Sequence, residues 1–135
     1  MPPEFRIFKP EYALELLRIA ESDLDSAHAL FEAKKGRLEN VLFLTEQVVE
    51  KALKAVLCYQ GKPVPLTHQL YIVISQFPNE GLPPGGYALN DLTPFATIRR
   101  YEEGKVVLTR EEVTQALFLV AQVLSWAKGK INEKH

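Results

Sequence analysis

The chain has 135 residues, of which 47% are hydrophobic and 24% charged, proportions that are ordinary for a globular domain. Its 16 Lys and Arg residues stand against 17 Asp and Glu residues, and the resulting net charge of −1 excludes a uniformly basic nucleic-acid coat and a polybasic membrane binder. The single cysteine, Cys58, excludes an intramolecular disulfide and a multi-cysteine zinc site.

The length predicts a single domain over residues 1–135, with its core between about residues 11 and 130. The first ten residues are interrupted by prolines and contain no apolar run of the kind found in secretory signals. No stretch of about 18 uncharged apolar residues is present, so we expect no membrane span. A lone buried thiol suits a reducing compartment, and we expect a cytoplasmic protein.

Two long amphipathic helices are predicted in the first half of the chain. From Glu11 to Lys35 the apolar face is expected to hold Leu14, Leu17, Ala20, Leu24, Ala27 and Phe31. The second helix runs from Leu38 to Gln60, and its wide apolar stripe indicates a central position. Its remaining surface is expected to carry Glu46, Gln47, Glu50, Lys51 and Lys54.

Shorter elements are predicted between these helices and the end of the chain. Gly61 ends the second helix, and the prolines at 63 and 65 predict an extended segment. Thr67 is expected to cap a helix that continues to Gln76. Residues 79–86 contain three glycines and two prolines and predict a loop.

A further short helical segment is expected over residues 89–101. Pro94 lies inside it, so either Thr93 caps a helix that has the proline in its first turn, or the proline kinks a longer helix. Residues 102–104 predict a turn, and residues 105–108 an extended segment.

The last helix begins with a capping box, in which Thr109 and Glu112 satisfy each other's backbone N–H groups. Its apolar face continues to about Ile131. The elements together predict an all-α fold, an antiparallel, up-and-down bundle of three long helices with one or two short ones.

No cofactor signature is present, and we predict neither a cofactor nor a metal site, because the three histidines lie far apart in the sequence. The densest polar feature is Arg99-Arg100-Tyr101, where two guanidinium groups could hold a phosphate while the ring stacks on a base. The alternative interpretation is an Arg–Glu surface cluster with Glu102 and Glu103.

Three segments resemble the HEPN domain family. The run Phe43-Leu44-Thr45-Glu46-Gln47 and its continuation Glu50-Lys51-Ala52-Leu53-Lys54-Ala55 are similar to the family's second-helix signature. The segment Thr67-His68-Gln69-Leu70 resembles its Thr-His-x-Leu step. Residues 89–101 resemble the run that leads into Arg-Tyr-Pro, with Arg100-Tyr101 followed here by Glu102 in place of proline.

The resemblance implies a compact helical bundle, commonly dimeric, with a function related to nucleotides or RNA. Stand-alone prokaryotic members are often encoded beside a minimal nucleotidyltransferase, and many such pairs are toxin–antitoxin systems. Some members are metal-independent RNases that use an Arg followed after four to six residues by a His. In this chain no Arg lies five to seven positions before His28, His68 or His135, so we assign no catalytic residue.

The preferred hypothesis is therefore a small HEPN-like protein that binds a nucleotide, RNA or a nucleotidyltransferase partner. The candidate ligand-binding residues are Gln47, Lys51, His68, Arg99, Arg100 and Tyr101. One alternative is a metal-independent RNase with an atypical site formed by His68 and Arg100. Another is a purely structural homodimer module, in which Arg100 forms an ion pair with Glu46 or Glu50.

Overall fold

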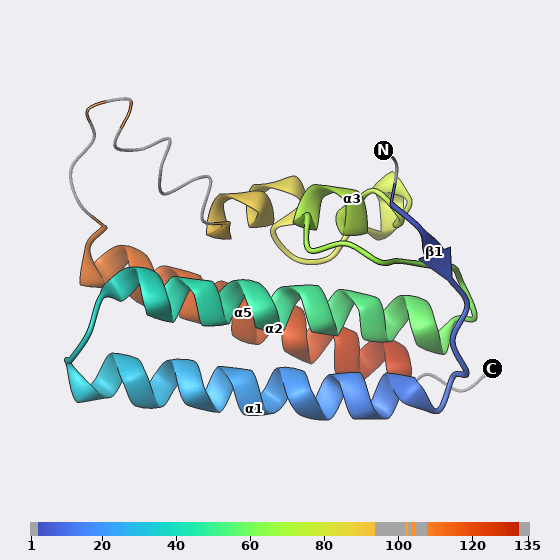
Figure 1. The fold of residues 1–135 in the computed structure, drawn as a ribbon, viewed down its shortest axis with the longest axis horizontal. Helices are drawn as coiled ribbons and strands as arrows, with labels where there is room; N and C mark the ends of the chain where they lie inside the picture. The colour runs from blue at the N-terminus through green and yellow to red at the C-terminus, as the bar shows by residue number, and fades with distance from the viewer. Residues whose placement is uncertain (1–2, 94–101, 103, 105–107, 133–135) are drawn as a thin grey trace.

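The computed structural model describes residues 3–93, 102, 104 and 108–132. Its main elements are three helices of 22 residues each, α1 (Tyr12–Ala33), α2 (Leu38–Tyr59) and α5 (Arg110–Ile131). They lie side by side with α2 in contact with both others, which confirms the all-α bundle (Figure 1). None of the described helices combines the length and the apolar character that crossing a membrane requires.

The chain direction reverses between α1 and α2, whereas α2 and α5 run the same way (Figure 1). The return leg between them is a layer of short elements beside α2. It contains β2 (Val64–Pro65), α3 (Leu70–Ile74) and the 3-10 helices η1 (Asn79–Gly81) and η2 (Gly86–Leu92). Both α3 and η2 pack against α2 and against each other, so this layer covers a side of α2 that α1 leaves open.

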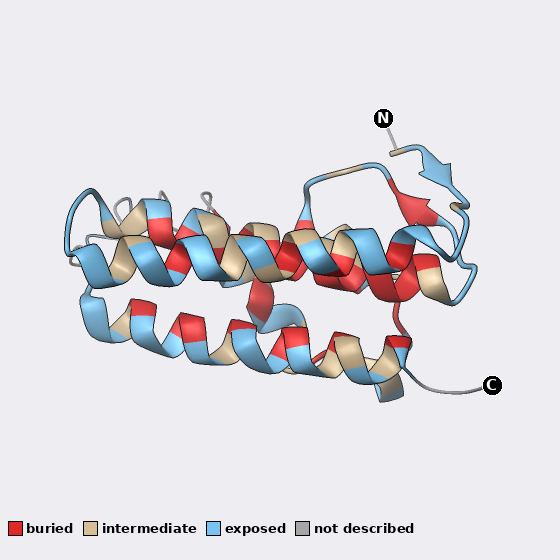
Figure 2. Cartoon of the chain, turned by 90° about the horizontal axis from the view of Figure 1, so that it is seen from below, coloured by how far each residue is buried: buried red, intermediate tan, exposed pale blue. Residues whose placement is uncertain are grey.

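The core lies where the long helices face one another, and their outward sides are exposed (Figure 2). Periodicity predicted this arrangement well for α2, whose apolar residues from Val48 to Leu57 are fully buried. It was wrong at Leu14, which is 62% exposed, because the helix turns Ala13 and Leu17 to the core instead. Cys58 is buried as expected for an inert core thiol, and burial raises its pKa.

The capping box at α5 is confirmed, since the Thr109 hydroxyl accepts from the Glu112 N–H at 3.2 Å. The extended segment before α3 is also confirmed. Its strand β2 pairs antiparallel with β1 (Phe5–Arg6), an N-terminal strand that the sequence did not predict.

One boundary prediction between α2 and α5 is wrong, and another is tested only in part. The helix expected to begin after Thr67 starts at Leu70, because the Thr67 hydroxyl accepts from the Gln69 N–H in a local turn instead of capping a helix. In the helical segment expected over residues 89–101, residues 89–92 belong to a 3-10 helix that ends at Leu92, which contradicts the longer helix kinked at Pro94. Thr93 is extended, as a residue before proline prefers to be, and residues 94–101 lie outside the described part of the chain.

Candidate functional site

One side of α2 carries a stripe of polar and aromatic residues with helical spacing. Phe43, Glu46, Gln47, Glu50 and Lys54 follow one another at intervals of one, three or four residues, so their side chains share a side of the helix. The prediction that Glu46 and Glu50 face solvent is wrong, since they are only 5% and 4% exposed. The physical reason is the short-element layer, which packs on this side of α2.

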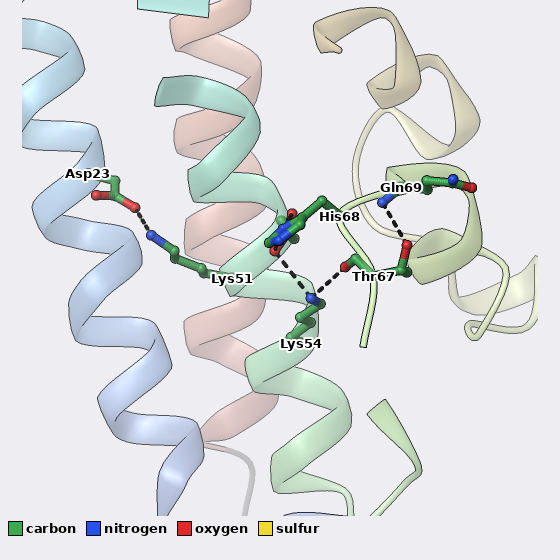
Figure 3. Close-up of polar contacts among 7 residues, drawn as sticks. Asp23, Lys51, Lys54, Thr67, His68 and Gln69 are labelled. Carbon is green, nitrogen blue, oxygen red and sulfur yellow. Dashed lines mark hydrogen bonds and ion pairs between the residues drawn. The ribbon is translucent and has the colours of Figure 1, made fainter. Parts of the chain in front are cut away.

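Glu50 is buried among partners that compensate its charge. Lys54, one helical turn further along α2, donates to Glu50 Oε2 at 3.2 Å. His68 Nδ1 lies 3.0 and 3.1 Å from the two Glu50 oxygens. Lys54 also donates to the Thr67 carbonyl at 2.7 Å, so one ammonium group ties α2 to the segment before α3 (Figure 3).

Glu46 lies one helical turn before Glu50 and has different surroundings. Its Oε2 atom is enclosed and finds no hydrogen-bond partner among the described residues. Burial raises the pKa of Glu46 to about 7, the nearby charge of Glu50 acts in the same direction, and His68 opposes the shift. At neutral pH this carboxyl is therefore divided between its neutral and ionised forms.

A cavity of about 730 Å³ opens beside Glu46, between α2, the start of α3 and the end of η2. This volume lies within the range of small-molecule sites. The lining residues are Phe43, Glu46, Gln47, His68, Gln69, Leu70, Tyr71, Asn90 and Thr93. The structure thus brings together Gln47 and His68, which the sequence placed in one cleft although they are far apart along the chain.

The other predicted site residues are not placed in this cavity. Lys51 points to α1, where its Nζ donates to Asp23 at 2.5 Å, away from His68 and Lys54 (Figure 3). Arg99, Arg100 and Tyr101 lie outside the described residues. The Glu50 carboxylate, one of the two expected acceptors for Arg100, is already bonded to Lys54 and His68.

Sequence reasoning missed several residues that line the cavity, chiefly Phe43, Glu46, Gln69, Tyr71 and Asn90. A signal was present for two of them, because Phe43 and Glu46 share a helix face with Gln47. Gln69 and Tyr71 flank the Thr-His-x-Leu step, and the position of His68 could have pointed to them. Asn90 had no local signal, because only the return of the chain along α2 brings η2 to this place.

The chemistry of the lining is that of recognition by stacking and hydrogen bonds. Phe43 and Tyr71 are 49% and 52% exposed, so both rings have surface to offer a ligand. Gln47, Gln69 and Asn90 each carry an amide that can donate and accept. In the part of the chain that the structure describes, no three His, Cys, Asp or Glu residues cluster as metal ligands would.

The chain matches the family model of the HEPN domain over residues 13–131, nearly its full length, and it belongs to this family. The match includes α2, α3 and η2, the elements that form the cavity, and all but the first residue of α1. A search of curated proteins and a search of solved structures give no match.

Proposed function

We propose that this HEPN protein binds a nucleotide, free or at an RNA end, with the base held in the cavity beside α2. Membership of the HEPN family supports a function related to nucleotides or RNA. The observation that carries the proposal is the lining itself, in which two accessible aromatic rings and three amides surround one space of about 730 Å³.

Stacking supplies the sequence-tolerant part of the affinity. Each base has a π-face, and stacking on an aromatic side chain contributes about 1–3 kcal/mol per base. Tyr71 belongs to α3 and Phe43 to α2, so rings from two different elements border the cavity. A base bound against these rings would also remove their exposed apolar surface from water, which is favourable.

The cavity is suited to a base more than to a phosphate. Its described lining contains no Lys or Arg, while one buried carboxyl group, Glu46, faces it. The only basic side chain in the described lining is His68, which is 84% exposed and can reach a ligand from the rim. We propose Arg99 and Arg100 as the phosphate-binding residues on sequence grounds alone.

Titration of the protein with nucleoside monophosphates, followed by NMR shifts of backbone amides, tests this function. We expect the largest shifts at Gln47, His68, Gln69 and Tyr71. Replacement of Tyr71 by Ala should weaken binding about tenfold, because one stacking surface is lost. Tyr87→Ala is the matched control, since Tyr87 is 48% exposed and does not line the cavity. The proposal is wrong if no nucleotide moves these resonances at millimolar concentration.

A second candidate function, metal-independent RNA cleavage, is favoured by one observation. Glu50 engages Nδ1 of His68, which leaves Nε2 as the ring nitrogen that a substrate can reach. A carboxylate that fixes the tautomer of a histidine is a common support for acid–base chemistry. RNA cleavage in the presence of EDTA that is lost in His68→Ala would establish this candidate, and equal cleavage by both proteins would remove it.

Homodimerisation and pairing with a minimal nucleotidyltransferase are proposals of the same kind. Phe118 is 68% exposed and Leu14 62%, and a homodimer interface that covers these side chains would remove their apolar surface from water. We expect sedimentation at micromolar concentration to give the mass of two chains, and the mass of one chain would contradict the dimer. Recovery of a small nucleotidyltransferase in equal amount from the native host would support a toxin–antitoxin role.

A further inference from the structure

We propose that the cavity selects guanine over the other bases, and that the Glu46 carboxylate is the residue that makes the selection. This inference rests on the proposed function, since it names the base that the nucleotide carries. It begins from a buried carboxyl group at the wall of a cavity, one oxygen of which has no hydrogen-bond donor among the residues that the structure describes.

The first step concerns the hydrogen bonding of the Glu46 carboxyl group. The residue is 5% exposed, and its Oε2 atom has no hydrogen-bond partner in the described part of the chain. A buried acceptor without a donor lowers the stability of the fold, so such a group usually has a reason to be retained. A donor from a ligand in the cavity would remove this cost.

The carboxyl group has to turn slightly to meet a ligand, because Oε2 itself is covered. This turn occurs about the terminal torsion of the glutamate side chain, which has a broad energy profile. The two carboxylate oxygens then accept together, as they do in bidentate pairs with forked donors.

The second step is the pattern of donors on the four bases. The Watson–Crick edge of guanine carries two neighbouring donors, the ring N1–H and the amino group at C2. Adenine and cytosine each place one amino donor beside a ring acceptor, and uracil places its single N–H between two carbonyl acceptors. An ionised carboxylate only accepts, so guanine alone satisfies both of its oxygens.

The third step concerns the remaining polar atoms of guanine, O6 and N7, which are both acceptors. The cavity lining supplies donors for them in the amide groups of Gln47, Gln69 and Asn90. Glu46 and Gln47 belong to α2, Gln69 directly precedes α3, and Asn90 belongs to η2. A neutral, protonated Glu46 would present one donor and one acceptor instead, and would suit adenine.

The experiment compares the affinities of guanosine, inosine, adenosine and cytidine 5′-monophosphates by calorimetry at pH 8. We expect guanosine monophosphate to bind about tenfold more tightly than the inosine analogue, which lacks only the C2 amino group. The adenosine and cytidine compounds should bind at least as weakly as the inosine compound. Glu46→Gln should abolish the preference for guanosine over adenosine monophosphate, because the amide presents one donor and one acceptor and so suits adenine better than guanine.

Glu32→Gln is the matched control, because Glu32 is exposed on α1 and does not line the cavity. Equal binding of all four compounds by the unaltered protein would overturn the selection while leaving nucleotide binding intact. A preference for adenosine monophosphate would indicate that Glu46 binds the base in its protonated form, and it would overturn the guanine inference. An unchanged preference in a folded Glu46→Gln protein would show that Glu46 does not make the selection. Absence of binding by every compound would instead overturn the proposed function.

Discussion

Glu46 and Glu50 are two carboxyl groups one helical turn apart on the same side of α2, and their surroundings are opposite. Glu50 accepts from Lys54 and lies 3.0 Å from His68 Nδ1, so its charge is met by two basic side chains. Glu46 is as deeply buried, yet Oε2 has no partner among the described residues. One end of the stripe is a completed polar cluster, and the other end borders a cavity.

The difference separates a structural role from a binding role. A buried charge with good partners holds two elements in register, and removing one partner leaves the other uncompensated. A buried charge without partners lowers stability, and titratable groups in such settings concentrate at functional sites. We therefore expect changes at Glu50 to destabilise the protein and changes at Glu46 to stabilise it while altering ligand recognition.

The largest predicted effect is that of Glu50→Ala. The substitution leaves Lys54, whose side chain is 14% exposed, bonded to the Thr67 carbonyl without its carboxylate, and it releases His68 from α2. Breaking such a buried pair costs about 3 kcal/mol. Urea unfolding measures the change, with Glu32→Ala on the exposed side of α1 as the control. A loss below about 0.5 kcal/mol, the range of ordinary surface substitutions, would show that the cluster is not structural.

The second prediction has the opposite sign. Glu46→Gln should raise the free energy of unfolding at pH 8 by about 2 kcal/mol, because a neutral amide avoids the cost of an ionised, uncompensated carboxyl. The gain should shrink as the pH falls toward about 5. Urea unfolding of both proteins at several pH values provides the measurement.

The sign of this pH dependence follows from the pKa of Glu46, which is about 7 in the folded chain against an ordinary value of 4.5. Between these values the folded chain holds a proton that the unfolded chain releases, so raising the pH through this window removes stability. The amide introduced by Glu46→Gln does not titrate. The difference in the free energy of unfolding between the variant and the parent protein therefore grows as the pH rises through the same window. A difference that is constant from about pH 5 to pH 8 would contradict the burial of an uncompensated carboxyl.

The smallest predicted effect is that of Lys51→Met. Lys51 bonds to Asp23 on α1, and both side chains are partly exposed, at 26% and 22%, so the loss in stability should be about 1 kcal/mol or less. Because Lys51 does not line the cavity, nucleotide affinity should stay within about twofold. A tenfold loss of nucleotide affinity would show that Lys51 belongs to the ligand-binding site, as predicted from the sequence.

Much of the fold could be predicted from the sequence because local signals carry it. The three- and four-residue spacing of apolar residues defines α1, α2 and α5, and the Thr109–Glu112 capping box defines where α5 begins. The short elements were predicted less well. Their boundaries depend on contacts with α2 and on 3-10 geometry, and neither has a strong periodic signal.

The candidate site was only partly predictable for a related reason. His68 and Gln47 stood out through their motif, and the structure places both at the cavity. Glu46 and Glu50 were interpreted as solvent-facing because charges on a polar helix stripe usually are. The packing of residues 67–93 on α2 covers this side of the helix, and this packing is a long-range property of the chain.

The most direct test of the role assigned to Glu46 is the titration of its side-chain carboxyl by ¹³C NMR, with and without saturating guanosine monophosphate. Glu50 raises the pKa of this carboxyl group and His68 lowers it. We predict a pKa of about 7 in the free protein. Two donated hydrogen bonds to the ionised form should lower the pKa in the complex by about one unit or more. A pKa at the ordinary value of 4.5 in the free protein, or a pKa that guanosine monophosphate leaves unchanged, would contradict this role.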